Sequence, residues 1–181
     1  MNLANYFEPH RETIRNKWIE AVFSSYPEKS KPFLRGNQNP FTNPVGGMVK
    51  EAADALLSAL EGEDVVIDNV KQSLDRFIKI RAVQDFTPSQ AIGVIYLLKP
   101  LLREHLLPSL EKGKGLKEYL ELESRVDSLV LLAFDMYVKD RDTVSEIRIQ
   151  EIRNQYAQLK RWAQQLNAQA PLGEFVGCGN H

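Results

Sequence analysis

The longest uninterrupted stretch of the chain decides the fold; it runs from Leu116 to Leu166 and reads LKEYLELESRVDSLVLLAFDMYVKDRDTVSEIRIQEIRNQYAQLKRWAQQL. No glycine or proline occurs between Leu116 and Ala170, and these two residue types interrupt a helix most strongly. The stretch is therefore permissive for helix from end to end. At about 1.5 Å per residue, a helix of about 50 residues reaches roughly 75 Å.

Two outcomes are open for a helix of this length. It exceeds the width of a domain of this size, so a continuous helix is expected to project as an extended C-terminal helix. The alternative is a break between Asp140 and Thr143, where Asp142 or Thr143 can cap a new helix.

The apolar pattern changes along this stretch. Up to about Val138 one side is strongly apolar, which predicts packing into a core. The residues of that side are Leu116, Tyr119, Leu120, Val126, Val130, Ala133, Phe134 and Tyr137. After Lys139 the apolar residues form a narrower stripe with steps of three and four, the period of a coiled coil. We name this stripe the seam; it consists of Ile149, Ile152, Tyr156, Leu159, Ala163 and Leu166.

The remaining sequence also has helical periodicity and no β alternation. Apolar spacing predicts helices over about residues 2–25, 44–61, 64–81 and 87–110, with short turns or an ordered loop over 26–42. The sequence thus predicts an all-α helical bundle. We expect a helical core over 1–138, which the resemblance described below implies to be sensor-like, a C-terminal helix or coiled-coil extension over 139–169 and a flexible tail over 170–181.

Two helix starts and one kink are marked by particular residues. Asn43 followed by a proline predicts the start of the helix over 44–61. Thr87 and Gln90 stand at the spacing of a capping box, in which each side chain bonds the backbone of the other. Pro100 lies inside the helix predicted over 87–110 and indicates a kink near Lys99.

The composition excludes several function classes. Of the 181 residues 43% are hydrophobic and 26% charged, which is typical of a globular protein that buries a core. The formal net charge of -1 provides no field for nucleic acid, and no apolar run is long enough for membrane insertion. One cysteine allows no internal disulfide, and the first residues lack the apolar run of a signal peptide. We expect a cytoplasmic protein.

Residues for cofactor or metal chemistry are few. His105 lies near an apolar helix face and is a candidate haem or small-ligand residue, but a packed histidine is the preferred interpretation. Cys178 is a candidate redox thiol on the tail, with a spectator cysteine preferred. No nucleophile elbow or phosphate loop occurs, so we expect no cofactor, no metal and no enzyme.

Three segments hold more polar detail than packing requires: residues 39–46, 81–91 and 133–137. Arg81, Asp85 and Asp135 are expected to form a partly buried charge network that fixes how loops meet helices. A ligand pocket is the alternative. Further members proposed for this network or pocket are Asn43, Gln84, Thr87 and Gln90.

These three segments resemble the RsbRD N-terminal family, the helical sensor-type domain that precedes STAS domains in RsbR-like stress regulators. The stretches that carry the resemblance are NPFTNPVG, RAVQDFTPSQA and LLAFDMY, in this order. The resemblance implies a globin-like or related bundle without haem. It further implies a dimeric sensory or protein-interaction module that transmits a signal through its C-terminal helix.

A STAS domain is not expected after Leu166, so the resemblance does not imply the phosphorylatable output of the stress regulators. Similar stand-alone proteins occur beside genes of dissimilatory sulfur metabolism. An accessory role there is the alternative function.

The seam is consistent with an interaction module, because its apolar side chains require cover from a second copy, a fold-back or another protein. In a parallel pair with Ile149 at position a, Arg141 faces Glu146 of the second copy, which is favourable. Arg148 faces Arg153, which is not. Both contacts are exposed, so their opposite contributions to the free energy of pairing are small and roughly cancel. We expect a homodimer and an unidentified protein partner.

Overall fold

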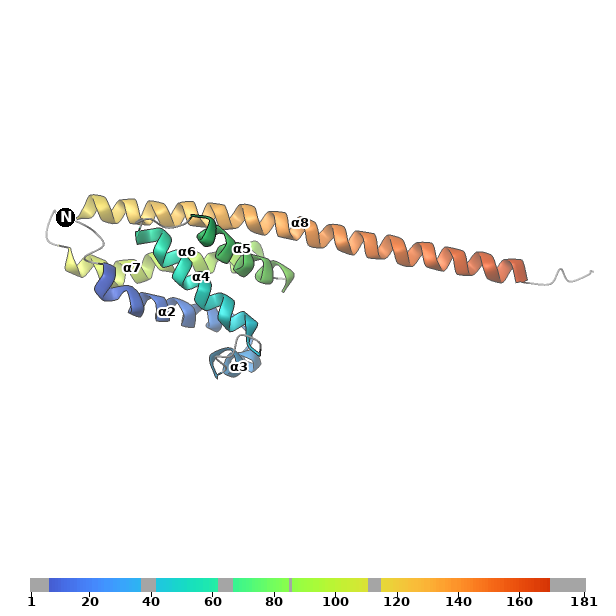
Figure 1. The fold of residues 1–181 in the computed structure, drawn as a ribbon, viewed down its shortest axis with the longest axis horizontal. Helices are drawn as coiled ribbons and strands as arrows, with labels where there is room; N and C mark the ends of the chain where they lie inside the picture. The colour runs from blue at the N-terminus through green and yellow to red at the C-terminus, as the bar shows by residue number, and fades with distance from the viewer. Residues whose placement is uncertain (1–6, 37–41, 62–66, 85, 111–114, 170–181) are drawn as a thin grey trace, which may run out of the picture. The chain divides into compact units, whose positions relative to one another are not determined.

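The computed structural model describes the chain outside residues 1–6, 37–41, 62–66, 85, 111–114 and 170–181 (Figure 1). All regular elements in these described ranges are helical, so the all-α prediction is confirmed. The elements are η1 (Glu8–His10), α2 (Arg11–Ser24), η2 (Glu28–Ser30), α3 (Lys31–Gly36), α4 (Pro44–Glu61), α5 (Ile67–Val83), α6 (Pro88–Tyr96), α7 (Leu98–Leu106), η3 (Leu107–Ser109) and α8 (Leu116–Gln169).

The chain divides into two compact units. Unit 1 is Met1–Arg141, and unit 2 is Asp142–His181. Unit 1 holds α2 to α7 and the first part of α8, while the described residues of unit 2 continue α8 alone. Among the described residues no helix is both long and apolar enough to cross a membrane.

The core of unit 1 is formed by α2, α4, α5, α6, α7 and the first part of α8. In Figure 1, α2 and α4 run close together, and the contacts between these helices agree. Trp18 of α2 is fully buried, and its indole Nε1 donates to the carbonyl oxygen of Val94 in α6 at 2.7 Å. Its ring lies 5.8 Å from that of Phe77 in α5. A single tryptophan therefore joins three helices.

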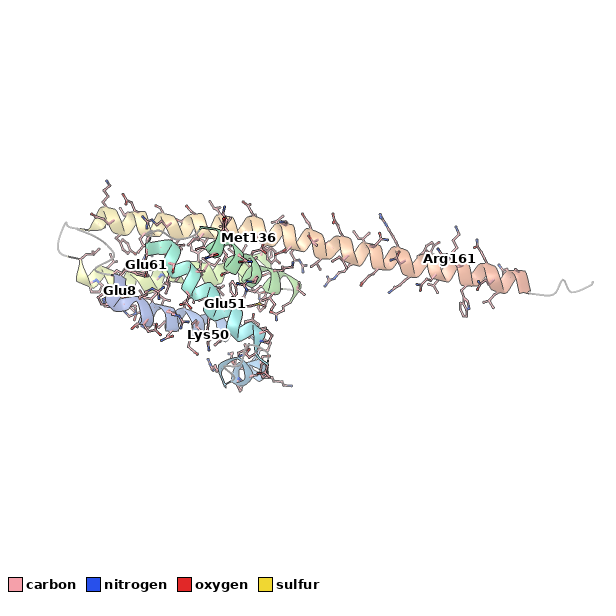
Figure 2. The ribbon with its side chains drawn as sticks, in the orientation of Figure 1. Glu8, Lys50, Glu51, Glu61, Met136 and Arg161 are labelled. Carbon is pink, nitrogen blue, oxygen red and sulfur yellow. The ribbon has the colours of Figure 1, made fainter. Side chains whose placement is uncertain are left out.

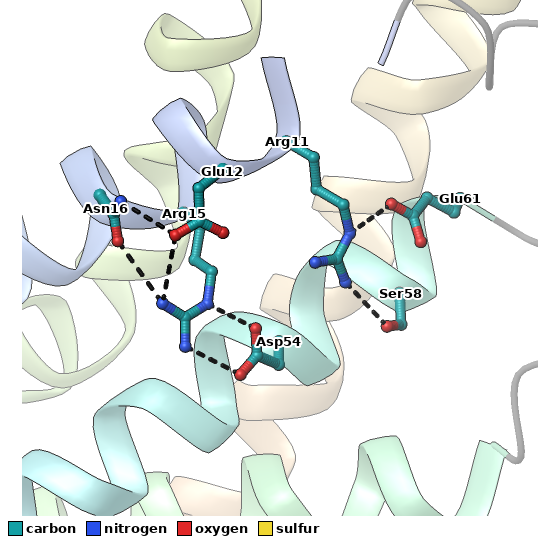
Figure 3. A network of polar contacts seen from close by, with 7 residues as sticks. All are labelled: Arg11, Glu12, Arg15, Asn16, Asp54, Ser58 and Glu61. Atoms are coloured by element: carbon teal, nitrogen blue, oxygen red, sulfur yellow. Dashed lines mark hydrogen bonds and ion pairs between the residues drawn. The ribbon is translucent and has the colours of Figure 1, made fainter. Parts of the chain in front are cut away.

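The interface between α2 and α4 also carries a polar network (Figure 3). Arg15 makes two hydrogen bonds to the carboxylate of Asp54, at 2.5 and 3.0 Å. Arg11 donates from Nε to Glu61 at 2.7 Å and from Nη2 to Ser58 at 3.5 Å. Hydrogen bonding to Asp54 raises the pKa of Arg15. These pairs fix the position of α2 along α4.

The helix predicted over 87–110 is two helices. α6 ends at Tyr96, and α7 begins at Leu98. The interruption is three to four residues before Pro100, which has no N–H to donate to the carbonyl of Tyr96. The kink predicted near Lys99 is therefore a break between helices at Leu97.

α8 is continuous from Leu116 to Gln169, so the break considered between Asp140 and Thr143 does not occur. In unit 1 its inner side is held by polar contacts with three partners. Arg103 pairs with Glu123 at 2.7 Å, Lys99 pairs with Asp127 at 2.7 Å, and Arg125 donates to the carbonyl of Leu60 at 2.6 Å. The buried apolar residues on this side are Tyr119, Leu122, Val126, Leu129, Ala133 and Tyr137.

The prediction of core packing is wrong for three residues of α8. Leu116, Leu120 and Phe134 are exposed by 54%, 53% and 47%. The reason is the helical period, which places them on a different side from Leu122 and Val126. Together with two further exposed residues they form a surface that we name the outer face; its members are Leu116, Leu120, Leu131, Phe134 and Val138.

Candidate functional site

The polar centre of unit 1 is Arg81, a residue of α5 whose side chain is fully buried. Its Nη2 donates to the carbonyl oxygen of Gln90 at 2.9 Å, and both terminal nitrogens lie 3.2 to 3.3 Å from the hydroxyl of Ser25. The guanidinium stacks over the ring of Phe86, with Cζ 4.0 Å from the centroid. Arg81 therefore connects α5 to the end of α2 and to the start of α6.

The electrostatics of Arg81 are those of a buried cation. Burial lowers the pKa of Arg81, and the neighbouring Tyr26 opposes the change. Burial raises the pKa of Tyr26, against the opposing charge of Arg81. Among the described residues Arg81 makes no ion pair, and its Nε has no hydrogen-bond partner. Within the described ranges the cation is stabilised by neutral oxygens and aromatic rings.

The turn between α5 and α6 is fixed by three further hydrogen bonds. Tyr26 donates to the side-chain oxygen of Gln84 at 3.1 Å. Tyr137 of α8 donates to the carbonyl of Phe86, and Arg141 donates to the carbonyl of Ala82 at 3.1 Å. Residues far apart in the sequence thus hold one turn. This arrangement orients the turn and the helices that meet at it.

Two of the predicted polar residues begin α6. The hydroxyl of Thr87 accepts from the backbone N–H of Gln90 at 3.3 Å, and the side chain of Gln90 accepts from the N–H of Thr87 at 3.0 Å. The predicted capping box is confirmed. Through its carbonyl oxygen Gln90 also belongs to the Arg81 cluster.

Asn43 lies in a different part of the fold. Its Oδ1 accepts from the N–H of Gly46 at 2.9 Å, which confirms the predicted start of α4. Its Nδ2 donates to the carbonyl of Leu34 at 2.9 Å. A Cβ at Gly46 would lie 2.3 Å from Asn43 Nδ2, so only glycine fits against this side chain. Asn43 therefore joins α3 to α4 and is not among the contacts of Arg81.

Of the two acidic residues proposed for the network, the structure describes only Asp135. Asp135 is exposed on α8 and is not among the hydrogen-bond partners of Arg81. Asp85 lies outside the described residues. The structure thus brings Arg81, Gln84, Thr87 and Gln90 together around one turn.

His105 lies on α7, next to α2, with only 17% of its side chain exposed. Its Nε2 is 3.1 Å from Nζ of Lys17, and its ring stacks on that of His10 with a centroid distance of 5.7 Å. Burial lowers the pKa of His105, and Lys17 contributes in the same direction. A ring nitrogen beside an ammonium group is poorly placed for iron, so this position gives the haem hypothesis no support.

Metal binding has no candidate site in the described ranges. No three histidine, cysteine, aspartate or glutamate side chains in this part of the chain are grouped to hold a metal ion. Cys178, the proposed redox thiol, lies outside the described residues.

In unit 2 the seam is exposed throughout. Its large side chains have exposed fractions between 48% and 70%; they are Ile149, Ile152, Tyr156, Leu159 and Leu166. Trp162 is also exposed, by 63%, and is absent from the sequence-based set because it falls outside the strict alternation of three and four. Arg161, labelled in Figure 2, is a basic residue of the same segment.

Sequence reasoning missed Ser25, Tyr26 and Tyr137 as neighbours of the α5–α6 turn. Ser25 and Tyr26 precede Arg81 by more than fifty residues, and Tyr137 follows it by a similar distance. Their helical spacing carries no signal for this turn. The sequence indicated Tyr137 only through the segment 133–137, which is one of the three that carry the family resemblance.

Comparison with known families identifies a match over most of the chain. The family model described as RsbT co-antagonist protein rsbRD N-terminal domain matches residues 12–152 of this chain. No curated protein and no solved structure matches the chain. The matched range contains the Arg81 cluster and the first two seam residues, Ile149 and Ile152.

Proposed function

We propose that this chain, which belongs to the RsbRD N-terminal family, is a non-catalytic regulatory module that pairs with a second copy and presents its seam to a protein partner. The family description names a co-antagonist, a role exercised through another protein. The buried polar groups of unit 1 support a structural role, because Arg81 and Asn43 hold turns and helix starts.

One observation carries the proposal: the seam is exposed over its whole length. Leaving one large apolar side chain in water forgoes about 1.5 to 3 kcal/mol of burial. Exposed apolar residues that recur on one helical side are typical of a surface that binds another helix. The seam therefore supports an interaction with a protein chain.

The outer face in unit 1 supports the pairing of two copies. Leu131 is 68% exposed, and Phe134 and Val138 are 47% and 41% exposed. These residues follow one another at steps of three and four on a helix that the core of unit 1 already fixes on its inner side. A rigid apolar surface can associate with its own copy at low entropic cost.

Sedimentation velocity over a range of concentrations tests the pairing. We expect the full chain to form a dimer. The double variant Leu131→Glu/Phe134→Glu is expected to weaken the dimer by about a hundredfold or more, because it buries two carboxylates in an apolar contact. Gln72→Glu, which adds a charge at an exposed position of α5, is the control and should leave the dimer unchanged.

The seam has its own variant. Ile152→Glu/Leu159→Glu should leave the dimer intact and abolish binding of a partner helix. A chain that stays monomeric at high concentration contradicts the pairing through the outer face. A partner helix that binds the seam variant as tightly as the natural chain contradicts the role of the seam.

A further inference from the structure

We infer that the partner seated on the seam is an amphipathic helix with acidic residues beside its apolar stripe, and not a second copy of this chain. The inference rests on the proposed function, since it names the chemistry of the partner that the seam binds. The observation behind it is the charge of the residues that border the seam in unit 2.

The border positions follow from the heptad. With Ile149 and Tyr156 at position a, the neighbouring e positions are Arg153 and Lys160. The g positions are Arg148, Gln155 and Trp162. Every charged residue that borders the seam from residue 148 onward is therefore basic. Glu151, the one acid of this stretch, is at position c and points away from a partner.

The structure leaves two of these basic residues, Arg153 and Lys160, available to a partner. Arg153 and Lys160 are exposed, and neither makes an ion pair within the described part of the chain. Each has a long aliphatic stem that can cover the edge of an apolar contact while its charge reaches a carboxylate on the partner.

These charges give a second copy no net attraction in either orientation. A parallel pair in register places Arg148 against Arg153. An antiparallel pair that aligns Ile149 with Leu166 places Arg153 against Lys160. In the parallel pair this repulsion is roughly balanced by the contact of Arg141 with Glu146 just ahead of the seam, and in the antiparallel pair no attractive charge pair lies within the seam to offset it.

An acidic helix removes this repulsion. Glutamate at the border positions of the partner meets Arg148, Arg153 and Lys160 with opposite charge, and charge complementarity of this kind selects one helical partner over another. Tyr156 and Trp162 supply the aromatic anchors, since both are exposed and large aromatic residues dominate binding at helical interfaces.

The experiment uses the full chain and two synthetic helices of about four heptads. Both peptides have isoleucine at a and leucine at d. One has glutamate at every e and g position, and the other has lysine there. Like charges at the e and g positions disfavour self-association of each peptide. Both peptides therefore remain available to bind the seam. Fluorescence anisotropy measures binding at about 25 mM and about 300 mM salt.

We expect the glutamate peptide to bind about tenfold or more tightly than the lysine peptide at low salt. The difference should shrink at high salt, where exposed charge pairs are screened. Equal affinity of the two peptides overturns the inference.

Two adjacent basic residues provide matched variants. Lys160→Glu changes a border position, whereas Arg161→Glu makes the same change of charge at position f, away from the partner. Lys160→Glu should reduce the preference for the glutamate peptide severalfold, and Arg161→Glu should retain it. An equal loss in both variants shows that net charge governs binding and overturns the inference.

A separate result distinguishes this inference from the proposed function. If Ile152→Glu/Leu159→Glu dissociates a dimer of the full chain and neither peptide binds, the seam pairs with a second copy. The acidic partner is then refuted, while the role of the seam as an interaction surface stands. If neither peptide binds and the seam variant changes no association, both the inference and the proposed role of the seam fail.

Discussion

The two parts of α8 are one continuous helix and both have apolar residues at helical spacing, yet they differ in what covers these residues. Between Leu116 and Arg141 the inner side packs into the core of unit 1, and Val126 and Ala133 are fully buried. In the second part Ile152 and Tyr156 are 64% and 70% exposed. The comparison shows that an apolar period specifies a helical face and does not specify its partner. Four pairs of variants test this difference, in order of decreasing expected effect.

The largest effect is expected from truncating the same residue type in each part. Leu122→Ala removes a side chain that is 2% exposed, and the cavity should lower the free energy of unfolding by about 2 to 5 kcal/mol. Leu159→Ala removes a side chain that is 61% exposed. This variant should change the free energy of unfolding by less than about 0.5 kcal/mol. Urea denaturation at low protein concentration measures both. Equal losses would show that Leu159 is buried within its own chain.

Arg81 tests whether polar contacts also distinguish the core from the exposed helix. Arg81→Ala should lower the free energy of unfolding by about 3 kcal/mol, because it empties a buried site and leaves the carbonyl of Gln90 without its donor. Arg81→Met refills most of the emptied volume. It should lower the free energy of unfolding by roughly half as much as Arg81→Ala does. Thermal and urea unfolding provide the measurement. If the two variants are equally unstable, the hydrogen bonds of Arg81 outweigh the packing of its stem.

A smaller effect is expected from removing one hydroxyl in each part of α8. Tyr137→Phe deletes the donor to the carbonyl of Phe86 and should cost about 1 kcal/mol. Tyr156→Phe alters an exposed side chain and should leave the free energy of unfolding within error. A loss at Tyr156 that matches the loss at Tyr137 would contradict the exposure of the seam.

The smallest effect is a dependence on pH. Hydrogen bonding to Arg103 lowers the pKa of Glu123 below its ordinary value of 4.5, and burial opposes the change. A depressed pKa in the folded state stabilises the protein at pH values above that ordinary value, and this stability is lost as the pH falls through the folded pKa. Glu123→Gln should therefore be less stable than the natural chain at neutral pH.

The difference should vanish in acid, where the natural carboxyl is protonated as well. Glu151→Gln, at an exposed position of the second part of α8, is the control. It should leave the free energy of unfolding unchanged at every pH. A Glu123→Gln variant whose loss of stability persists at pH values well below the ordinary pKa would show that shape and not charge matters at this position.

The positions at which helices begin were predictable where a polar capping residue marks them, because a cap interacts with residues only a few positions away. The pair Asn43 and Pro44 predicts the beginning of α4, and the spacing of Thr87 and Gln90 predicts the capping box. The absence of glycine and proline over residues 116–170 predicts a helix there, but it left open a break between Asp140 and Thr143, which α8 does not have. In each case the residues that interact are within a few positions of one another.

The candidate site was only partly predictable because its contacts join distant segments. The sequence singled out Arg81 and Gln90, but it paired Arg81 with carboxylates, whereas the described structure surrounds it with Ser25, Phe86 and a carbonyl oxygen. Likewise, periodicity placed Phe134 and Val126 in one apolar set, and packing exposed the first and buried the second.

By itself, the sequence determined that this chain is helical, where several of its helices begin, that residues 116–170 are permissive for helix throughout and that a coiled-coil period runs along the seam. Each of these depends on backbone preferences and on side chains three or four residues apart. The tertiary structure alone decided which side of α8 faces the core, that Arg81 is buried with its guanidinium against Ser25, Phe86 and the carbonyl of Gln90, and that the outer face and the seam remain in water. These depend on which distant surfaces compete to cover a given apolar side, and no local pattern encodes the outcome of that competition.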